Sequence, residues 1–530
     1  MVRRSDILLL ALLLGVGIAY QLVFLKQGIG LIDEGHLANA ARRVAAGEVL
    51  YRDVYSVYPP ASFYSVAMLF ELFGPSLIVA RAFHVALTLA LSCCVFLLCR
   101  AWMPAAWAML AGLLVAATGW GAIVERCHYA YLYGAFPFVA LLLLSKDSAE
   151  GPSWRRLFAV GLLAGLTLAF RFVPFIGLAA AVGVILLLSA GGVRRAIGAL
   201  GPLCVGFCFV WIPIGLYFNF HSAAADLARA VFWTSFEQYV GGGEFNLPYP
   251  ALRLWPSEWT RAGLSGLFVN WEFYWPLAIY LAAAIDFGRA MRRRRRAAGD
   301  AALRIGERVD VATRLRLAVL IFGALLFLRV LGRSDYYHLA PVLVPAYILG
   351  ADFLARLWRR VVPTESDRWA PVVVVVAMLA SFWLHGIDNE TRRAFDREGK
   401  VEIVPGGPWV REAGPLDDLV RALRERTAAD EPIVVLPFYP ILYFLAERPN
   451  PTRYDWLFPG YLRDADAIAG MIKDIDESDV RVVVYSPASI DGRSDRSLAV
   501  FAPEVARYLR RRFEPAERFG RFVLMTRRER

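Results

Sequence analysis

Long apolar runs separated by short charged clusters occupy most of the first three quarters of the chain. A helix needs about 20 apolar residues to cross the hydrocarbon core of a bilayer, so these runs predict about eleven membrane-spanning helices. The predicted spans comprise residues 7–25, 82–99, 101–124, 127–145, 157–170, 172–193, 196–217, 273–285, 317–328, 336–351 and 369–387. The eighth, ninth and tenth are the weakest, because a charge interrupts each of them after a short run.

The pattern changes near residue 388, where runs of spanning length end. Short β-branched runs predict buried strands, and amphipathic stretches predict helices. The elements expected there are strands at 432–436 and 480–485, helices at 464–475 and 498–511, and a terminal strand or hairpin at 513–526. We therefore predict a polytopic α-helical membrane domain, residues 1–387, followed by a small soluble α/β domain, residues 388–530.

Composition supports the membrane assignment, and charge predicts how the chain is oriented in the membrane. Hydrophobic residues make up 58% of the 530 residues and the mean hydropathy is +0.47, which a soluble core could not accommodate. The net charge of +11 lies largely in short basic clusters such as Arg292–Arg296, a pattern typical of cytoplasmic loops rather than of nucleic-acid binding. Lys and Arg are more frequent in the connections on one side of the predicted spans, and such an excess marks the cytoplasmic side. This charge bias predicts a cytoplasmic N-terminus and an extracytoplasmic C-terminal domain in a plasma (inner) membrane.

Two connections on the predicted outer side are long. Residues 26–75 contain an acidic pair, an amphipathic stretch and a short apolar helix, 61–73, that suits the membrane interface. Residues 219–272 are rich in aromatic side chains and proline, as expected for a segment at headgroup level. The first of these connections holds the strongest candidate chemistry.

That candidate is the pair Asp33-Glu34, which follows the first span by about eight residues. One interpretation is an ordinary helix N-cap, since an aspartate there accepts backbone N–H bonds. The other is a general base held against the membrane, where a lipid-borne substrate presents its head group. The pair alone leaves both open.

Cationic groups are predicted on the same side. Arg333, Asp335, Tyr337 and His338 lie in the turn between the ninth and tenth spans, where an arginine fork and a histidine could bind phosphate or simply anchor the interface. Further candidates on this side are Arg171, between spans five and six, and the group Glu125, Arg126 and His128. Anchoring charges would be expected on both faces, so this convergence favours a binding site.

The sequence contains no phosphate-binding loop, nucleophile elbow, dinucleotide fingerprint or metal-ligand spacing. The six cysteines fall almost entirely within apolar runs, and none follows Cys208. We therefore predict no metal and no disulfide in the C-terminal domain.

The first outer loop resembles that of the glycosyltransferase-C superfamily. The closest branch is similar to bacterial relatives of the dolichyl-phosphate-mannose protein mannosyltransferases and of the aminoarabinose–lipid A transferases. The resemblance covers residues 1–387, with a weaker likeness at Asn450–Tyr454. It rests on the acidic pair Asp33-Glu34, on Gly47, on Tyr51-Arg52-Asp53 and on Pro59-Pro60, directly after the first span.

The resemblance implies an inverting transfer of a sugar from a polyprenyl-phosphate donor to an acceptor on the non-cytoplasmic face. It places the catalytic carboxylate on Asp33, with Glu34 beside it. The candidates for binding the donor phosphate are Arg333, His338, Arg171 and Arg126, and those for substrate contacts are His36, Tyr58, Asp335 and Tyr337. Other than the lipid-linked sugar, no cofactor is implied.

The chain departs from the family pattern in three places. Tyr58 stands where a lysine often precedes Pro-Pro, so one phosphate contact is missing. Tyrosines follow Arg126 where an aspartate is common. His36 replaces the usual tyrosine and could compete with Asp33 as base.

Two other functions remain open from the sequence. A transporter or lipid flippase is disfavoured, because the chain shows no paired halves and its polar groups gather at one face. A non-catalytic assembly protein that keeps the fold is the third hypothesis. The sugar and the acceptor, whether lipid, polysaccharide or protein, are not specified by the sequence.

Overall fold

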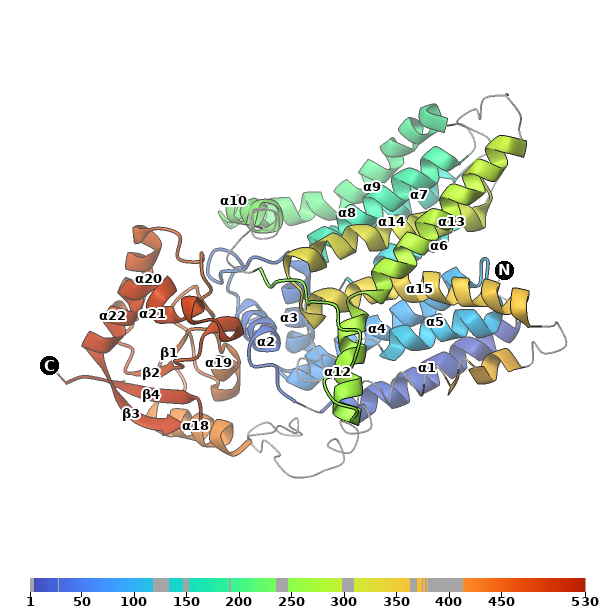
Figure 1. Ribbon diagram of the computed structural model, residues 1–530. Coiled ribbons are helices and arrows are strands. Elements are labelled where there is room, and N and C mark those ends of the chain that lie inside the picture. Colours follow the sequence, from blue (N-terminus) through green and yellow to red (C-terminus); the bar gives the residue numbers. More distant parts are fainter. Residues whose placement is uncertain are drawn as a thin grey trace.

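The computed structural model describes residues 4–26, 28–117, 133–145, 152–189, 192–234, 246–297, 309–362, 369–373, 375–376, 379 and 413–529. A bundle of long helices carries residues 413–529 at one end, and the N-terminus lies at the opposite end (Figure 1). We call the end that carries residues 413–529 the domain end of the bundle. The predicted span 369–387 falls mostly outside the described residues, and so do Glu125, Arg126 and His128.

Apolar helices build the bundle, as expected for a polytopic membrane protein. Their bounds are α1 (Arg4–Phe24), α4 (Leu77–Cys99), α5 (Ala105–Ala117), α6 (Phe136–Ser145), α7 (Trp154–Phe170), α8 (Phe172–Leu188), α9 (Gly192–Phe220), α13 (Trp275–Ala297), α14 (Val311–Gly332) and α15 (Tyr336–Val361). In the described part of the chain, five helices are long and apolar enough to cross a bilayer: α1, α4, most of α9, α14 and α15.

Three helices are longer than their apolar runs predict. α13, α14 and α15 all continue past the charges that end those runs. The reason is visible in the ion pairs between them. Asp352 on α15 is buried and pairs with Arg316 of α14 and with Arg356 on its own helix, both at 3.0 Å. Charges that neutralise one another in this way can stay within helices at the membrane edge.

The first long loop folds into two short helices between the bundle and the C-terminal residues (Figure 1). They are α2 (Asp33–Ala45) and α3 (Ala61–Phe73). The bounds of α3 are those predicted for the interfacial helix, and Met68, Leu72 and Phe73 expose its apolar face. The second long loop contains α10 (Ala224–Ala228), the π-helix η3 (Arg229–Thr234) and α12 (Arg261–Glu272).

Residues 413–529 form a four-stranded sheet with helices. The strands are β1 (Ile433–Leu436), β2 (Val482–Tyr485), β3 (Phe513–Phe519) and β4 (Phe522–Arg527), in the order β1-β2-β4-β3. β1 and β2 are parallel, and the remaining pairs are antiparallel. The helices are α18 (Ala413–Arg426), α19 (Ile441–Ala446), α20 (Ala465–Glu477), α21 (Leu498–Phe501) and α22 (Pro503–Arg512). The strands and the terminal hairpin lie where the sequence predicts them.

The two faces of the sheet belong to different cores. On one face, Val434 and Val483 share a core with Ile475 and Leu509 of α20 and α22. On the other, residues such as Val435 share one continuous core with Leu37 of α2 and with α3. The C-terminal residues are therefore packed directly onto the first loop.

Candidate active site at the domain end

Asp33 is the first residue of α2, and its side chain is half-buried. The N-cap position belongs to Ile32, whose side chain makes no capping hydrogen bond. The N-cap interpretation of Asp33 is therefore wrong. A carboxylate in the first turn is still favoured electrostatically, because the helix dipole and the unpaired N–H groups make that end positive.

Glu34, next in sequence, has a different environment. Its carboxylate is buried and accepts two hydrogen bonds from the guanidinium of Arg81 on α4, at 2.6 and 2.7 Å, and one from the backbone N–H of Gly30 at 2.8 Å. Arg81 also donates to the carbonyls of Leu25 and Gly28. The pair fixes the turn that leads from the first span into α2, and so fixes the position of Asp33.

His36 is fully buried beneath the C-terminal residues. Its ring stacks on Trp456, with centroids 4.3 Å apart, and its Nδ1 lies 3.7 Å from the Asp455 carboxylate. The structure thus places His36 in an interface, where it contacts protein on its ring face and edge. Asp33 and His36 are not equivalent candidates for a base, since only Asp33 retains solvent exposure.

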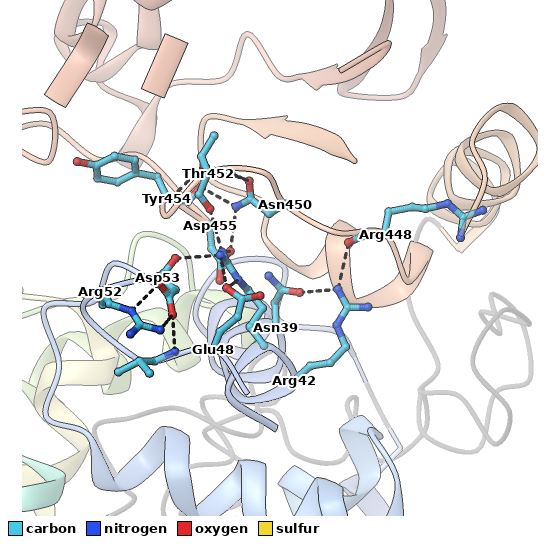
Figure 2. A network of polar contacts seen from close by, with 12 residues as sticks. Asn39, Arg42, Glu48, Arg52, Asp53, Arg448, Asn450, Thr452, Tyr454 and Asp455 are labelled. Atoms are coloured by element: carbon cyan, nitrogen blue, oxygen red, sulfur yellow. Dashed lines mark hydrogen bonds and ion pairs between the residues drawn. The ribbon is translucent and has the colours of Figure 1, made fainter. Parts of the chain in front are cut away.

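A polar network joins α2 to the C-terminal residues (Figure 2). Arg43 donates to the Asp455 carboxylate at 2.7 Å and to the Thr452 carbonyl at 3.1 Å, and it also pairs with Glu48. Arg42 donates to the carbonyl of Arg448 at 3.1 Å. Burial would raise the pKa of Asp455, but Arg43 and His36 outweigh it and hold that pKa well below its usual range. The interface therefore contains a charged carboxylate, which accepts from Arg43 and Asn450 through one of its oxygens.

The segment Asn450–Tyr454, whose likeness to bacterial family members was weak, forms part of this interface. The Asn450 side chain donates to the Tyr454 carbonyl and to Asp455. The backbone of Arg453 accepts a bond from the Tyr55 N–H at 2.7 Å, and its guanidinium donates to the Tyr51 carbonyl. The segment thus contacts both α2 and the loop after it.

A second feature of the domain end is a small cavity lined by cations, here called the cationic cavity. Its lining includes Arg171, Arg329, Tyr337 and His338, with a volume of about 30 Å³, room for two or three water molecules. The Arg171 guanidinium lies over the ring of Tyr58, 4.7 Å from its centroid. Tyr58 follows α2 in the same loop, so the cationic cavity adjoins the loop that carries Asp33.

Within this cavity a chain of bonds orients His338. Its Nδ1 lies 2.5 Å from the Asp335 carboxylate, and its Nε2 lies 2.5 Å from an Arg329 nitrogen. A carboxylate only accepts and a guanidinium only donates, so a neutral ring with the proton on Nδ1 satisfies both contacts. Asp335 therefore serves as an orienting group, and it also caps α15 through the His338 N–H.

Arg333 is occupied by carboxylates. It pairs with Asp335 at 2.7 Å and with Asp491 of the C-terminal residues at 3.0 Å. Asp491 in turn accepts from Arg496. Arg333 thus joins the turn between α14 and α15 to the C-terminal residues. Arg171 and Arg329, in contrast, line the cationic cavity.

Three residues of the site were missed by the sequence. Arg81 and Arg329 border the predicted spans 82–99 and 317–328, where the sequence pattern does not distinguish an interfacial charge from one with a buried partner. Asp455 gave no signal, because its partners Arg43 and His36 lie about 400 residues earlier in the chain. As for metals, the described residues contain no group of three His, Cys, Asp or Glu placed to hold one.

Comparison with solved structures shows that the chain has the fold of the glycosyltransferase-C superfamily. The aminoarabinose transferase ArnT from Cupriavidus metallidurans, solved with undecaprenyl phosphate, matches with a TM-score of 0.58 and 16% identity, over 97% of each chain. Its apo state matches with a TM-score of 0.57. The archaeal oligosaccharyltransferase AglB from Archaeoglobus fulgidus, solved with an inhibitory peptide and a dolichol-phosphate, matches with a TM-score of 0.51 and 12% identity, over 98% of this chain and 74% of its own.

Comparison of the sequence with protein-family models and with curated proteins finds no match. The likeness is therefore one of fold, at a sequence identity too low to carry an activity. It agrees with the resemblance seen in the first outer loop.

The interface at His36 predicts a dependence of stability on pH. Burial lowers the pKa of His36 from its ordinary 6.5, and Asp455 opposes this only in part. The folded state favours neutral His36, so its contribution to stability is full above pH 6.5 and is lost as the pH falls below it. We expect the Tm of the purified protein in detergent to drop by several degrees between pH 7.5 and pH 5.

His36→Gln is expected to weaken this dependence on pH. The matched control is His221→Gln, at a half-buried histidine of the loop after α9, which should keep it. Asp455 does not contribute in this range, since its lowered pKa confines its titration to more acidic pH. A Tm of the wild type that is constant from pH 7.5 to pH 5 would contradict the assignment.

Proposed function

We propose that the protein is an inverting glycosyltransferase that moves a sugar from a polyprenyl-phosphate donor to an acceptor at the domain end. The observation that carries the proposal is the position of Asp33. It begins a helix that the buried Glu34–Arg81 pair holds on one side and the C-terminal residues hold on the other. The fold is shared with structures solved with undecaprenyl phosphate and with dolichol-phosphate.

The chemistry requires one base. Asp33 accepts the proton of an acceptor hydroxyl, and the resulting oxygen attacks the anomeric carbon of the donor sugar. The bond from that carbon to the phosphate oxygen breaks, and both of its electrons leave with polyprenyl phosphate. Attack opposite the leaving group inverts the anomeric centre. Phosphate departs without a proton, so no second carboxylate is needed, in contrast to glycosidases.

We assign the stabilisation of the departing phosphate to the cationic cavity. Arg171 and Arg329 present guanidinium groups beside the loop of Asp33, and His338 orients Arg329 by accepting one of its N–H bonds. Guanidinium donors favour charge that develops on the leaving oxygen. Arg126 remains a candidate, and Arg333, Tyr58 and Tyr337 are proposed to support this side of the site.

The charge bias of the loops supports an orientation with the domain end on the non-cytoplasmic face of a plasma (inner) membrane. In this orientation residues 1–387 form the transferase domain, and residues 388–530 form an extracytoplasmic domain over it. A lipid-linked donor would then reach the cationic cavity from the bilayer. The acceptor would approach from the side of the C-terminal residues.

A deletion strain tests the proposal without knowledge of the substrates. Mass spectrometry of its envelope lipids, polysaccharides and glycoproteins should show one class that lacks a single type of glycosyl residue, restored by the wild-type gene. An unchanged profile, or a change only in the sidedness of a lipid, would contradict the transferase and favour the transporter hypothesis.

A further inference from the structure

A second cavity at the domain end lies between the first loop and the C-terminal residues. Its volume is about 190 Å³, space for on the order of a dozen water molecules. Three segments far apart in sequence enclose it: the loop after α2, the α10–η3 segment and the C-terminal residues. We call it the junction cavity. The lining residues that matter most are Tyr55, Arg229, Arg453, Tyr454, Tyr461 and Arg463.

Three arginines from two of these segments line the junction cavity. Arg453 is held in place by the Tyr51 carbonyl, and its buried Nε has no hydrogen-bond partner among the described residues. Arg463 donates to Thr234 at 3.3 Å, which holds its guanidinium at the wall of the cavity. Arg229 is exposed, and its charge acts on Tyr55 across the cavity.

Two aspartates also line the cavity and do not cancel this charge. Asp464 is committed to the N-terminus of α20, where it accepts the backbone N–H of Ala467 at 2.8 Å. Asp226 is the other. The three arginines and two aspartates therefore give the cavity lining a net charge of +1. The arginines also act together on Tyr55. Burial raises the pKa of Tyr55, while the charges of Arg463, Arg453 and Arg229 each lower it.

Tyrosines provide the remaining surface. Tyr55 packs against Tyr454 and Tyr461 with ring centroids 5.2 and 4.9 Å apart. Each tyrosine offers an apolar face beside a hydroxyl that donates and accepts. This combination suits a saccharide, whose C–H faces pack on aromatic rings while its hydroxyls form hydrogen bonds. A guanidinium fork adds recognition of a carboxylate or phosphate.

The junction cavity is connected to the proposed reaction centre through the first loop. The Tyr51 hydroxyl donates to the Tyr58 carbonyl at 2.8 Å, and the Tyr58 ring lies under Arg171 of the cationic cavity. The loop that follows α2 thus contacts both cavities. One is bounded by bundle helices, and the other by the C-terminal residues.

We propose that the junction cavity binds the acceptor, and that the acceptor carries an anionic saccharide, a sugar with a carboxylate or phosphate substituent. The proposal rests on the transferase function and adds the class of acceptor to it. The donor is lipid-linked and would reach the cationic cavity from the bilayer. The junction cavity is lined largely by C-terminal residues, and it combines cationic with aromatic groups.

Binding of small probes to the full-length protein in detergent tests this. Saturation-transfer NMR and competition would compare glucuronate and glucose 6-phosphate with glucose and inorganic phosphate. We expect at least one of the anionic sugars to bind at least tenfold more tightly than glucose and than phosphate. Preference between glucuronate and glucose 6-phosphate separates a carboxylate from a phosphate acceptor. Equal binding of glucose, or of inorganic phosphate, would overturn the proposal.

The variant Arg229→Gln/Arg463→Gln should weaken binding of the anionic sugar at least tenfold. Arg253→Gln, at an exposed arginine outside the cavity, is the matched control and should bind like the wild type. If the double variant is not obtained folded, Arg229→Gln alone carries the test, because its side chain is exposed. Binding unchanged by these substitutions would contradict the assignment.

Binding of the sugar probes does not require the transfer reaction, so it tests the acceptor site separately from the transferase function. Asp33→Asn should bind the anionic sugar like the wild type even though transfer is lost. A protein in which Asp33→Asn keeps transfer would contradict the catalytic assignment and leave the acceptor site intact. A protein that transfers sugar but does not bind the anionic probes would contradict only the acceptor site.

Discussion

Asp33→Asn is expected to abolish glycan transfer in cells, with a loss of activity of about 10²–10⁴-fold, the range for removal of a general base. The amide keeps the shape of the side chain and its place at the start of α2 but cannot accept the acceptor proton. The measurement is complementation of the deletion strain, with the missing glycosyl residue quantified by mass spectrometry. Membrane levels of the variant should equal those of the wild type.

The control for Asp33 is Asp495→Asn, which removes one negative charge from an exposed position among the C-terminal residues. It should complement fully. Asp33→Glu keeps a carboxylate but moves it by one methylene, and we expect partial activity. Full complementation by Asp33→Asn at normal expression would show that another group is the base, or that the reaction needs none.

Arg81→Met is expected to have the second large effect, on folding. It would leave the Glu34 carboxylate buried without its main partner, and removing one partner of a buried pair costs about 3–5 kcal/mol. Both oxygens of Glu34 are engaged, and Arg81 also holds the turn at Leu25 and Gly28. We expect a much lower yield of folded protein, measured by fluorescence-detected gel filtration and by the Tm in detergent.

The double variant Glu34→Gln/Arg81→Met separates structure from catalysis at Glu34. It removes the stranded charge and should recover a large share of the folded protein lost in Arg81→Met. Recovered protein that transfers sugar would show that Glu34 acts by holding α2. Recovered, well-folded protein without transfer activity would instead assign Glu34 a direct part in the reaction.

The extent of the membrane part could be predicted because hydrophobic length is a property of each segment by itself. α1, α3 and α8 begin within a few residues of their predicted positions. The ends of α13, α14 and α15 could not be predicted, because the charges that seemed to end them are paired between helices. Ion pairs between helices depend on tertiary packing, which the sequence of a single segment does not reveal.

For the candidate site, too, some residues could be predicted from the sequence and others could not. The resemblance pointed to Asp33, and charge at one face pointed to Arg171 and His338, which the structure brings to the domain end. The sequence could not show that Glu34 faces Arg81, or that His36 is buried against Trp456 and Asp455. Those contacts depend on how α4 and the C-terminal residues pack around α2, and the second of them joins residues about 400 positions apart.

The close fit at α2 gives the C-terminal residues a defined part in the site. A Cβ added at Gly35 would lie 2.5 Å from the backbone nitrogen of Ile441 in α19, a contact that cannot be relieved by a side-chain rotation. The helix that begins with Asp33 therefore meets the C-terminal residues without space between them. Its orientation, and with it the direction of the Asp33 carboxylate, depends on that contact.

The most direct test of the account is transfer in proteoliposomes that contain the purified protein and radiolabelled polyprenyl-phosphate sugars from the native membrane. The wild type with native envelope acceptor should move label to the acceptor and release polyprenyl phosphate, with inversion at the anomeric carbon. Asp33→Asn should do neither. Movement of the intact labelled lipid across the bilayer without release of polyprenyl phosphate, or undiminished transfer by Asp33→Asn, would contradict the account.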